Sequence, residues 1–506
     1  MDLETLLSYQ WGAMTPEFII VGVTVLIMII DLLMSEKTDR RPLAWIGLAG
    51  ILFALVSLIG LLDLEATSIL NDTFRLDSFA KAFKLILLVG AAFVFLLSIS
   101  YEPKEGMGDR GEFYYLFLTA LLGAMFMTSS SDMITLFVGL ELLSISSYIL
   151  AGIRKRNQLS NESAMKYVIN GGISTAIILF GMSYVYGLTG STNLLEIAYQ
   201  LSNLLESDLQ YIMALSFLIL FVGLSFKLAA APFHMWAPDV YQGAPTPVTA
   251  FLSVVSKAAG LVLVLRMFIS IFANTPANGG TSVSMLFSMQ DYIAFLAGAT
   301  MIIGNTIALR QRNVKRLLAY SSIAHAGYLL VAFVSLSVFM FDAIWFYLIA
   351  YLFMNLGVFA ILQVVTDKTG SEDISQFAGL YRRSPLTAIA MGIFILSLAG
   401  IPGTAGFIGK VKIFLSAFIV DPAHYVLAAI MIAMTVVSYF YYFGILTQMF
   451  FRPAEENSAP IKLPIGVLIV VVLSVIGTIT FGIAPGIALD FLYNNFNGFA
   501  DFFPQQ

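Results

Sequence analysis

Cysteine is absent from this chain of 506 residues, and aspartate, glutamate, lysine and arginine together make up only 11% of it. Without cysteine, the chain forms no disulfide, holds no iron–sulfur cluster through thiolates and has no cysteine nucleophile. The glycines before Lys410 do not form a phosphate-binding loop, because Val411 follows the lysine, and no dinucleotide-binding or nucleic-acid-binding motif is present. We therefore expect no cofactor or metal in this chain and assign any redox chemistry to a partner.

Hydrophobic residues, in contrast, make up 59% of the sequence, a share above that of a soluble domain. A run of about 20 apolar residues crosses the hydrocarbon core of a bilayer as a helix. The sequence predicts fourteen such helices, near 16–34, 43–62, 79–99, 113–129, 132–152, 163–187, 209–231, 246–273, 291–309, 317–335, 338–366, 386–419, 423–450 and 464–486. We expect an all-α polytopic membrane protein that lies in a lipid bilayer.

The lysines and arginines between these spans gather in alternate loops. One set, with Lys37 and Lys104 among its cations, consists of loops 35–42, 100–112, 153–162, 310–316, 367–385 and 451–463. The opposite set holds only Arg75, while Lys81 and Lys84, near an outer helix end, are expected at the membrane interface. Cytoplasmic loops are the ones that carry such an excess of positive charge. The pattern predicts a multi-pass protein of the cell (plasma) membrane with both termini outside, since the number of spans is even.

Two apolar stretches are too long for a single crossing, and each contains helix breakers. Residues 386–419 would form a helix of roughly 50 Å against a hydrocarbon core of about 30 Å, and they contain Gly400 and Pro402. The span 209–231 continues into an apolar, aromatic segment that reaches Pro238. Broken helices in paired, inverted repeats are typical of transporters that bind ions at mid-membrane.

This arrangement of spans divides the chain into four predicted segments. They are an N-terminal three-helix segment (1–112), a first five-helix repeat (113–273), a second five-helix repeat (291–450), and a C-terminal helix with a tail (464–506). Because five is an odd number, the second repeat is expected to be inverted relative to the first. The broken helix is the fourth helix in each repeat.

Three lysines, Lys227, Lys257 and Lys410, lie inside the predicted spans. A charge at the centre of a bilayer costs on the order of 3 kcal/mol, so lysines retained there indicate a path for protons or ions. Glu141 is the acid expected mid-span in the first repeat, and Lys227 is the partner that we expect for it. Burial disfavours the charged form of a lysine and a nearby carboxylate favours it, so this pair could load and unload a proton. The alternative is a static structural ion pair.

Four further residues are secondary candidates. His325 lies among serines inside a span, where its chemistry suits either a proton relay or a hydrogen-bonded core histidine. Lys166 lies a turn inside the cytoplasmic end of its span and either admits protons or extends to the interface. His234, beside the first helix break, could line an entry path. Lys412 lies on a different helical face from Lys410 and is the alternative to it as the third relay lysine.

Three long motifs make the chain resemble the antiporter-like membrane subunits of respiratory complex I. They are the runs 226–248, 313–325 and 398–410. The first contains Asp-Val-Tyr-Gln-Gly-Ala-Pro-Thr-Pro, the form of subunit N (subunit 2) rather than that of the L and M subunits. The resemblance extends over essentially the whole chain, and no lateral amphipathic helix follows the last span.

The resemblance implies a role for each of the central residues. In such subunits the glutamate matching Glu141 pairs with the lysine matching Lys227, the lysine matching Lys257 bridges two half-channels, and the one matching Lys410 leads to the outer side. The resemblance also implies a translocase that couples quinone reduction to proton transfer. NADH or another donor, the quinone and the iron–sulfur clusters would be bound by the other membrane and peripheral subunits.

Two alternatives stay open from the sequence. One is a subunit of a multisubunit cation/proton antiporter or of a membrane-bound hydrogenase, which shares the buried Glu and Lys arrangement. The other is a membrane scaffold with no translocation of its own. Copurified peripheral iron–sulfur subunits would favour complex I, and loss of pumping on neutralising Glu141 or Lys227 with assembly intact would exclude the scaffold.

Overall fold

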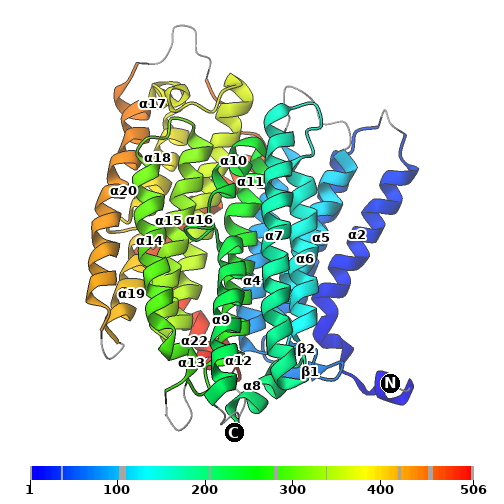
Figure 1. Cartoon of the computed structure of the whole chain (residues 1–506). Coiled ribbons are helices and arrows are strands. Elements are labelled where there is room, and N and C mark those ends of the chain that lie inside the picture. The colour runs from blue at the N-terminus through cyan, green and yellow to red at the C-terminus, as the bar shows by residue number, and fades with distance from the viewer. Residues whose placement is uncertain are drawn as a thin grey trace.

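The chain folds into a bundle of long, roughly parallel helices (Figure 1). This computed structural model describes residues 3–35, 38–101, 110–203, 207–277, 283–337, 339–419, 423–453 and 460–502. The loop cations Lys37 and Lys104 lie outside these residues. Both marked chain ends lie at the same end of the bundle (Figure 1), as an even number of crossings requires.

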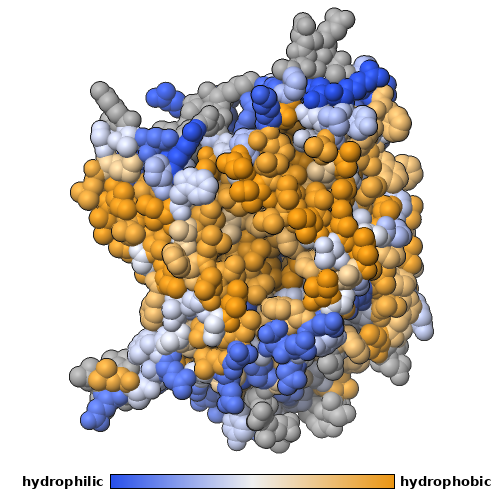
Figure 2. All heavy atoms as spheres, turned by 180° about the vertical axis from the view of Figure 1, so that it is seen from behind, coloured by the Kyte–Doolittle hydropathy of each residue, from blue (hydrophilic) through white to orange (hydrophobic). Residues whose placement is uncertain are grey.

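Apolar side chains cover the middle of the face of the molecule that Figure 2 shows. They form a broad band with hydrophilic residues above and below. Thirteen helices in the described part of the chain are long and apolar enough to cross a membrane. The predicted all-α polytopic fold is confirmed.

The N-terminal part contains three of these helices and a small hairpin. Its elements are α1 (Leu3–Ser8), η1 (Trp11–Met14), α2 (Thr15–Leu33), α3 (Arg41–Ile59), β1 (Thr67–Ile69), β2 (Phe74–Leu76) and α4 (Ser78–Ile99). The strands are antiparallel, with Ser68 opposite Arg75. Asp77 caps α4 by accepting a hydrogen bond from the backbone nitrogen of Ala80 at 2.8 Å. Lys84 is fully buried in an ion pair with Glu17, so the expectation that it lies at the interface is wrong.

The middle of the chain forms two further groups of helices. The first comprises α5 (Arg110–Ser129), α6 (Met133–Ala151), α7 (Gln158–Thr189), α8 (Leu194–Ser202), α9 (Ser207–Leu228), α10 (Trp236–Gly243), α11 (Thr246–Phe251), the π-helical η2 (Leu252–Ser256) and α12 (Lys257–Phe272). The second comprises α13 (Met285–Ser288), α14 (Gln290–Ala308), α15 (Val314–Val334), α16 (Phe339–Thr369), η3 (Ile374–Phe377), α17 (Leu380–Arg383), α18 (Pro385–Ala399), α19 (Ala405–Ile419) and α20 (Tyr425–Phe451). The chain ends with α21 (Ile465–Ile483), α22 (Gly486–Phe496) and η4 (Asn497–Phe499).

Both predicted helix breaks are present. α9 ends at Leu228 and α10 begins at Trp236, while α18 ends at Ala399 and α19 begins at Ala405. At the second break, Gly400 has a φ of +84°, a conformation that glycine adopts without steric cost. Thirteen of the fourteen predicted crossings are long helices. The remaining crossing is formed by α18 and α19 together.

Hydrogen bonds within the loop between α7 and α8 hold the start of α8 next to the start of α6. The backbone nitrogen of Ser191 bonds to Thr189 Oγ1 at 3.4 Å, and that of Asn193 bonds to Ser191 Oγ at 3.2 Å. Asn193, which caps α8, forms an isolated β-bridge with Asp132, which caps α6. This loop therefore fixes the first turns of α6 and α8 against each other.

The loop between α16 and η3 repeats this pattern at the opposite end of the bundle (Figure 1). The backbone nitrogen of Ser371 bonds to Thr369 Oγ1 at 3.4 Å, and that of Asp373 bonds to Ser371 Oγ at 3.3 Å. Asp373 caps η3 and forms a bridge with Asn313, the cap of α15. The shared sequence is Thr-Gly-Ser-x-Asn/Asp. The matching junctions agree with two related units, whose boundaries at 113–273 and 291–450 remain a prediction.

Candidate functional site

Lys227 lies in the last turn of α9, directly before the first break. Its side chain is buried, and its Nζ donates a hydrogen bond to Ser144 Oγ on α6 at 3.0 Å. Gly260 of α12 packs against it, and a Cβ atom at this glycine would lie only 3.0 Å from Lys227 Cγ. The lysine is therefore held between α6 and α12 by a hydroxyl and by close packing.

Glu141 lies one turn before Ser144 on α6, but its side chain turns toward α7. There it accepts a hydrogen bond from Thr175 Oγ1 at 2.8 Å and is only half-buried. Among the described residues, no ion pair within 4.0 Å joins Glu141 and Lys227. Ser144 therefore binds the lysine in this structure, and the pairing of Glu141 with Lys227 remains a prediction.

Lys257 is the first residue of α12 and directly follows the π-helical turn η2. Its side chain is 3% exposed, and its Nζ donates to both the backbone oxygen and the Oγ of Ser322 on α15. π-Helical turns inside α-helices are frequent at functional sites. The extra residue in this turn sets the direction in which Lys257 leaves the helix, and that direction is toward α15.

His325 lies one turn after Ser322 on α15, and two tyrosines bind its ring. Its Nδ1 lies 2.5 Å from Tyr347 Oη, and its Nε2 lies 3.2 Å from Tyr442 Oη. Tyr442 Oη also lies 2.5 Å from Ser321 Oγ. A buried imidazole with a hydroxyl on each nitrogen has a donor and an acceptor in place on both sides, as proton transfer through the ring requires.

Lys410 on α19 donates hydrogen bonds back to the end of α18. Its Nζ lies 2.9 Å from Leu398 O and 3.0 Å from Ala399 O. The same ammonium lies 5.0 Å from the centre of the Tyr328 ring, whose centre is 5.5 Å from that of His325. Lys412 is only half-buried and lies 5.9 Å from the Phe346 ring centre. The structure thus places Lys410, rather than Lys412, beside the histidine.

The two remaining candidates lie at one side of this arrangement. Lys166 is partly exposed and contacts Glu162 at 2.6 Å and Asp239 at 2.5 Å, and Asp239 also binds Arg316. Burial opposes ionisation of Asp239, but its hydrogen bonds with Lys166 and Arg316 outweigh this and hold its pKa below the ordinary value. These contacts describe an ion cluster that joins α7, α10 and α15.

His234 is buried in the first break, and its Nδ1 has no hydrogen-bond partner within the described ranges. Its ring centre lies 6.5 Å from that of Tyr320 on α15. Among the described residues, no hydrogen bond connects it to Lys227. Within the part of the chain that the structure describes, no group of three or more histidine, aspartate or glutamate side chains is arranged to hold a metal ion.

Sequence reasoning missed the hydroxyl groups that connect these charged residues. They are Ser144, Tyr347 and Tyr442. The serines noted near His325 are Ser321 and Ser322, and only the fold shows that they bind Tyr442 and Lys257. Tyr347 and Tyr442 come from other helices, so only the packing of α16 and α20 against α15 identifies them.

The middle of the chain matches a known protein family. Residues 130–436 match the family described as "NADH:quinone oxidoreductase/Mrp antiporter, TM". The chain is 66% identical to NADH-quinone oxidoreductase subunit N of Geobacillus sp. (strain WCH70), over 97% of its own length and 100% of the relative. It is 67% identical to the protein of the same name from Anoxybacillus flavithermus, over 99% and 100%.

The fold is also similar to a solved structure. A chain of respiratory complex I from Thermus thermophilus with bound aureothin superposes with a TM-score of 0.77 at 30% identity, covering 94% of this chain and 99% of the other. The similarity extends along both chains nearly from end to end.

Proposed function

The chain belongs to the family of NADH:quinone oxidoreductase and Mrp antiporter membrane subunits, and we propose that it moves protons through the half-buried Glu141 and the buried Lys227, Lys257, His325 and Lys410. It is an antiporter-like, proton-translocating membrane subunit of an NADH-quinone oxidoreductase, as the relatives covering the whole chain are. The family also includes cation/proton antiporters. The identity to subunit N relatives favours the oxidoreductase over the antiporter or hydrogenase alternative.

The observation that carries this proposal is the set of hydrogen bonds that adjacent residues of α15 make with Lys257 and with the partner of His325. Lys257 binds Ser322, and Ser321 next to it binds the Tyr442 hydroxyl, which in turn contacts His325. Lys410 lies against the Tyr328 ring, which is also a neighbour of the histidine. Neutral hydroxyls and an imidazole between two lysines suit proton transfer better than they suit a static ion pair, because an ion pair needs an acid at this point.

The proposed mechanism starts at Lys227. Burial disfavours its ammonium form and the carboxylate of Glu141 favours it, so a change in their separation loads or releases a proton. A released proton then moves to Lys257, through His325 and on to Lys410. Lys166 and His234 stand near the first break as secondary groups, with Lys166 engaged in its ion cluster and His234 buried in the break.

The proposal includes a location, an orientation and partners. We place the chain in the cell membrane, with both termini and α8 outside and the loop that precedes α15 in the cytoplasm, because positive residues gather on that side. NADH, the quinone and the iron–sulfur clusters belong to the other subunits, and this chain contributes no redox centre. Because the chain has no cysteine, single cysteines at exposed Arg156 and Gln200 test the orientation: an impermeant maleimide added to intact cells should label Gln200→Cys and spare Arg156→Cys.

The function is tested by proton pumping in inverted membrane vesicles from a Lys227→Ala strain, normalised to electron transfer and to assembled complex. The account predicts loss of most pumping per electron with assembly preserved. Unchanged pumping at full electron transfer would instead favour the scaffold. Lys412→Ala is the matched control, since it removes a partly buried lysine that lies outside the relay.

A further inference from the structure

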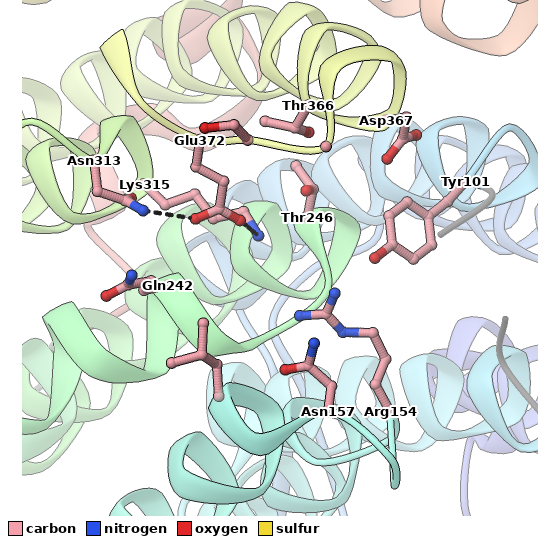
Figure 3. A pocket seen from close by; sticks show the side chains of 13 residues that line it. Tyr101, Arg154, Asn157, Gln242, Thr246, Asn313, Lys315, Thr366, Asp367 and Glu372 are labelled. Carbon is pink, nitrogen blue, oxygen red and sulfur yellow. Dashed lines mark hydrogen bonds and ion pairs between the residues drawn. The ribbon is translucent and has the colours of Figure 1, made fainter. Parts of the chain in front are cut away.

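Two cavities toward opposite ends of the bundle differ in the side chains that line them. The cavity of about 350 Å³ where α15 begins is polar, and its charges pair within it, as Lys315 Nζ does with Glu372 Oε1 at 2.8 Å (Figure 3). The cavity of about 240 Å³ toward the other end has an entirely apolar lining. This lining includes Leu85 and Val89 of α4, Trp345 and Phe353 of α16, Phe481 of α21 and Phe491 of α22.

The apolar cavity offers water no hydrogen-bond partner. Trp345 carries the one polar side-chain atom among the lining residues, and its Nε1 already donates to Ala82 O at 3.1 Å. Cavities without polar groups stay dry and take up apolar molecules instead. The molecule that suits this space is therefore a hydrocarbon rather than water or an ion.

The walls of the apolar cavity are held in place by contacts outside it. α22, which follows the last span, is tied to α16 because Tyr493 Oη donates to Asp342 Oδ2 at 2.5 Å. The rings of Phe491 and Trp345 are stacked at an angle of 19°, with their centres 6.3 Å apart. α22 therefore forms a fixed side of the cavity and keeps the space open.

The apolar cavity is elongated along the spans and open at its rim. Trp345 and Phe353 are eight residues apart on α16, which separates them by about 12 Å along the helix axis. One leaflet of a bilayer contributes a hydrocarbon layer of about 15 Å. Ile487 at the rim is 57% exposed, and Phe481 is partly exposed. A helix of a partner subunit, about 10 Å in diameter, is too wide to enter the space, whereas an extended acyl chain suits its length and chemistry.

We propose that the apolar cavity binds one acyl chain of a membrane phospholipid, taken from the leaflet on the side where both chain ends lie. The chain enters past Ile487 and Phe481 and extends along α16 between Val89 and Phe353. The headgroup then lies at the membrane surface near α22. The inference needs only that the protein spans a membrane, and it is independent of the proposed proton relay.

The test places the photoreactive residue benzoylphenylalanine at Phe481 in the assembled complex, which is purified, washed with detergent to remove bulk lipid, and illuminated. The same residue at Phe440 of α20, which is 69% exposed, is the matched control. We expect the washed complex to keep most of its phospholipid adduct at position 481, identified by the mass of the peptide, and to lose it several-fold at position 440. Equal loss at both positions would mean bulk lipid only and would overturn the site. A crosslink from position 481 to a partner subunit would overturn it as well.

A second variant tests the cavity within the same complex. The ring of Val89→Phe would fill the space from α4 and displace the acyl chain, so the adduct at position 481 should fall several-fold. Val436→Phe, at an exposed position of α20, should leave the adduct unchanged. If the complex does not assemble with benzoylphenylalanine at Phe481, the same residue at Phe491 probes the same space. An undiminished phospholipid adduct in assembled Val89→Phe would place the lipid outside the cavity and contradict the proposal.

Discussion

The two helix breaks carry a lysine each, but they satisfy their freed backbone groups in different ways. At the first break, Phe226 O accepts from Trp236 Nε1 at 3.0 Å, and the backbone nitrogen of Ala231 donates to Thr300 Oγ1 at 2.9 Å. Lys227 takes no part and binds Ser144 instead. Neutral side chains thus cap this break, so Lys227 is not needed as a cap and can take part in the proposed relay.

At the second break the lysine itself is the cap. Lys410 Nζ donates to the last two carbonyls of α18. A methyl group added at Gly400 would lie only 2.8 Å from Lys410 Cδ, so glycine is required there for space as well as for its positive φ. A cation at a helix C-terminus stabilises the unpaired carbonyls and the negative end of the helix dipole. Proton release from Lys410 therefore weakens a structural contact, whereas proton release from Lys227 does not.

The largest difference is expected between Lys410→Ala and Lys227→Ala. Removing Lys410 leaves two buried carbonyls without their donor, at about 1–3 kcal/mol each. We expect Lys410→Ala to lower both the amount of assembled complex and the pumping per electron, and Lys227→Ala to lower only the pumping. Native gels with vesicle pumping measure the two effects. If the two variants assembled in equal amounts, Lys410 would not stabilise the second break as its contacts suggest.

The neutral cap of the first break is tested by Trp236→Phe. The change removes the donor to Phe226 O and keeps an aromatic ring against Tyr167, whose centre is 4.6 Å away. We expect a loss of about 1–3 kcal/mol in stability, seen as a lower melting temperature, with pumping per electron retained. Trp345→Phe is the matched control, since its indole also donates to a backbone oxygen, Ala82 O, at 3.1 Å. A pumping defect in Trp236→Phe alone would show that this cap also serves the relay.

The sequence predicted the positions of both breaks and of the three lysines, because glycine, proline and buried charge are local signals. It could not predict how each break is capped. The indole of Trp236 and the hydroxyl of Thr300 reach the first break from separate elements, and the choice between Lys410 and Lys412 depended on where α18 ends. The pairing of Glu141 with Lys227 was predicted from residue type alone, which could not show that Ser144 is the hydrogen-bond partner of the lysine.

A smaller effect is expected from Gly260→Ala. The added methyl group would lie 3.0 Å from Lys227 Cγ and would displace the lysine from Ser144 by a few tenths of an ångström. We expect a modest decrease in pumping per electron, measured in vesicles. Gly298→Ala in α14, where the nearest atom would lie at 3.5 Å, should be silent. No change in Gly260→Ala would mean that the position of Lys227 is not critical.

The smallest effect concerns the ion cluster that ties α10 to its neighbours. Because the pKa of Asp239 is held below its ordinary value, its contacts stabilise the fold above about pH 4 and lose this contribution as the pH falls through the folded-state pKa. Asp239→Asn should therefore lower the melting temperature by a constant amount between pH 6 and pH 8, equivalent to about 1 kcal/mol or less. A difference that varies over this range would contradict the charged state assigned to Asp239.

The relay as a whole is tested most directly at Lys257, which stands between Lys227 and His325 in the proposed order of transfer. Proton pumping per electron would be measured in inverted vesicles carrying Lys257→Met, which keeps the length and bulk of the side chain and removes the charge, beside Lys412→Met. The account predicts that Lys257→Met assembles and loses most of its pumping while Lys412→Met pumps like the parent. Full pumping in assembled Lys257→Met would contradict it.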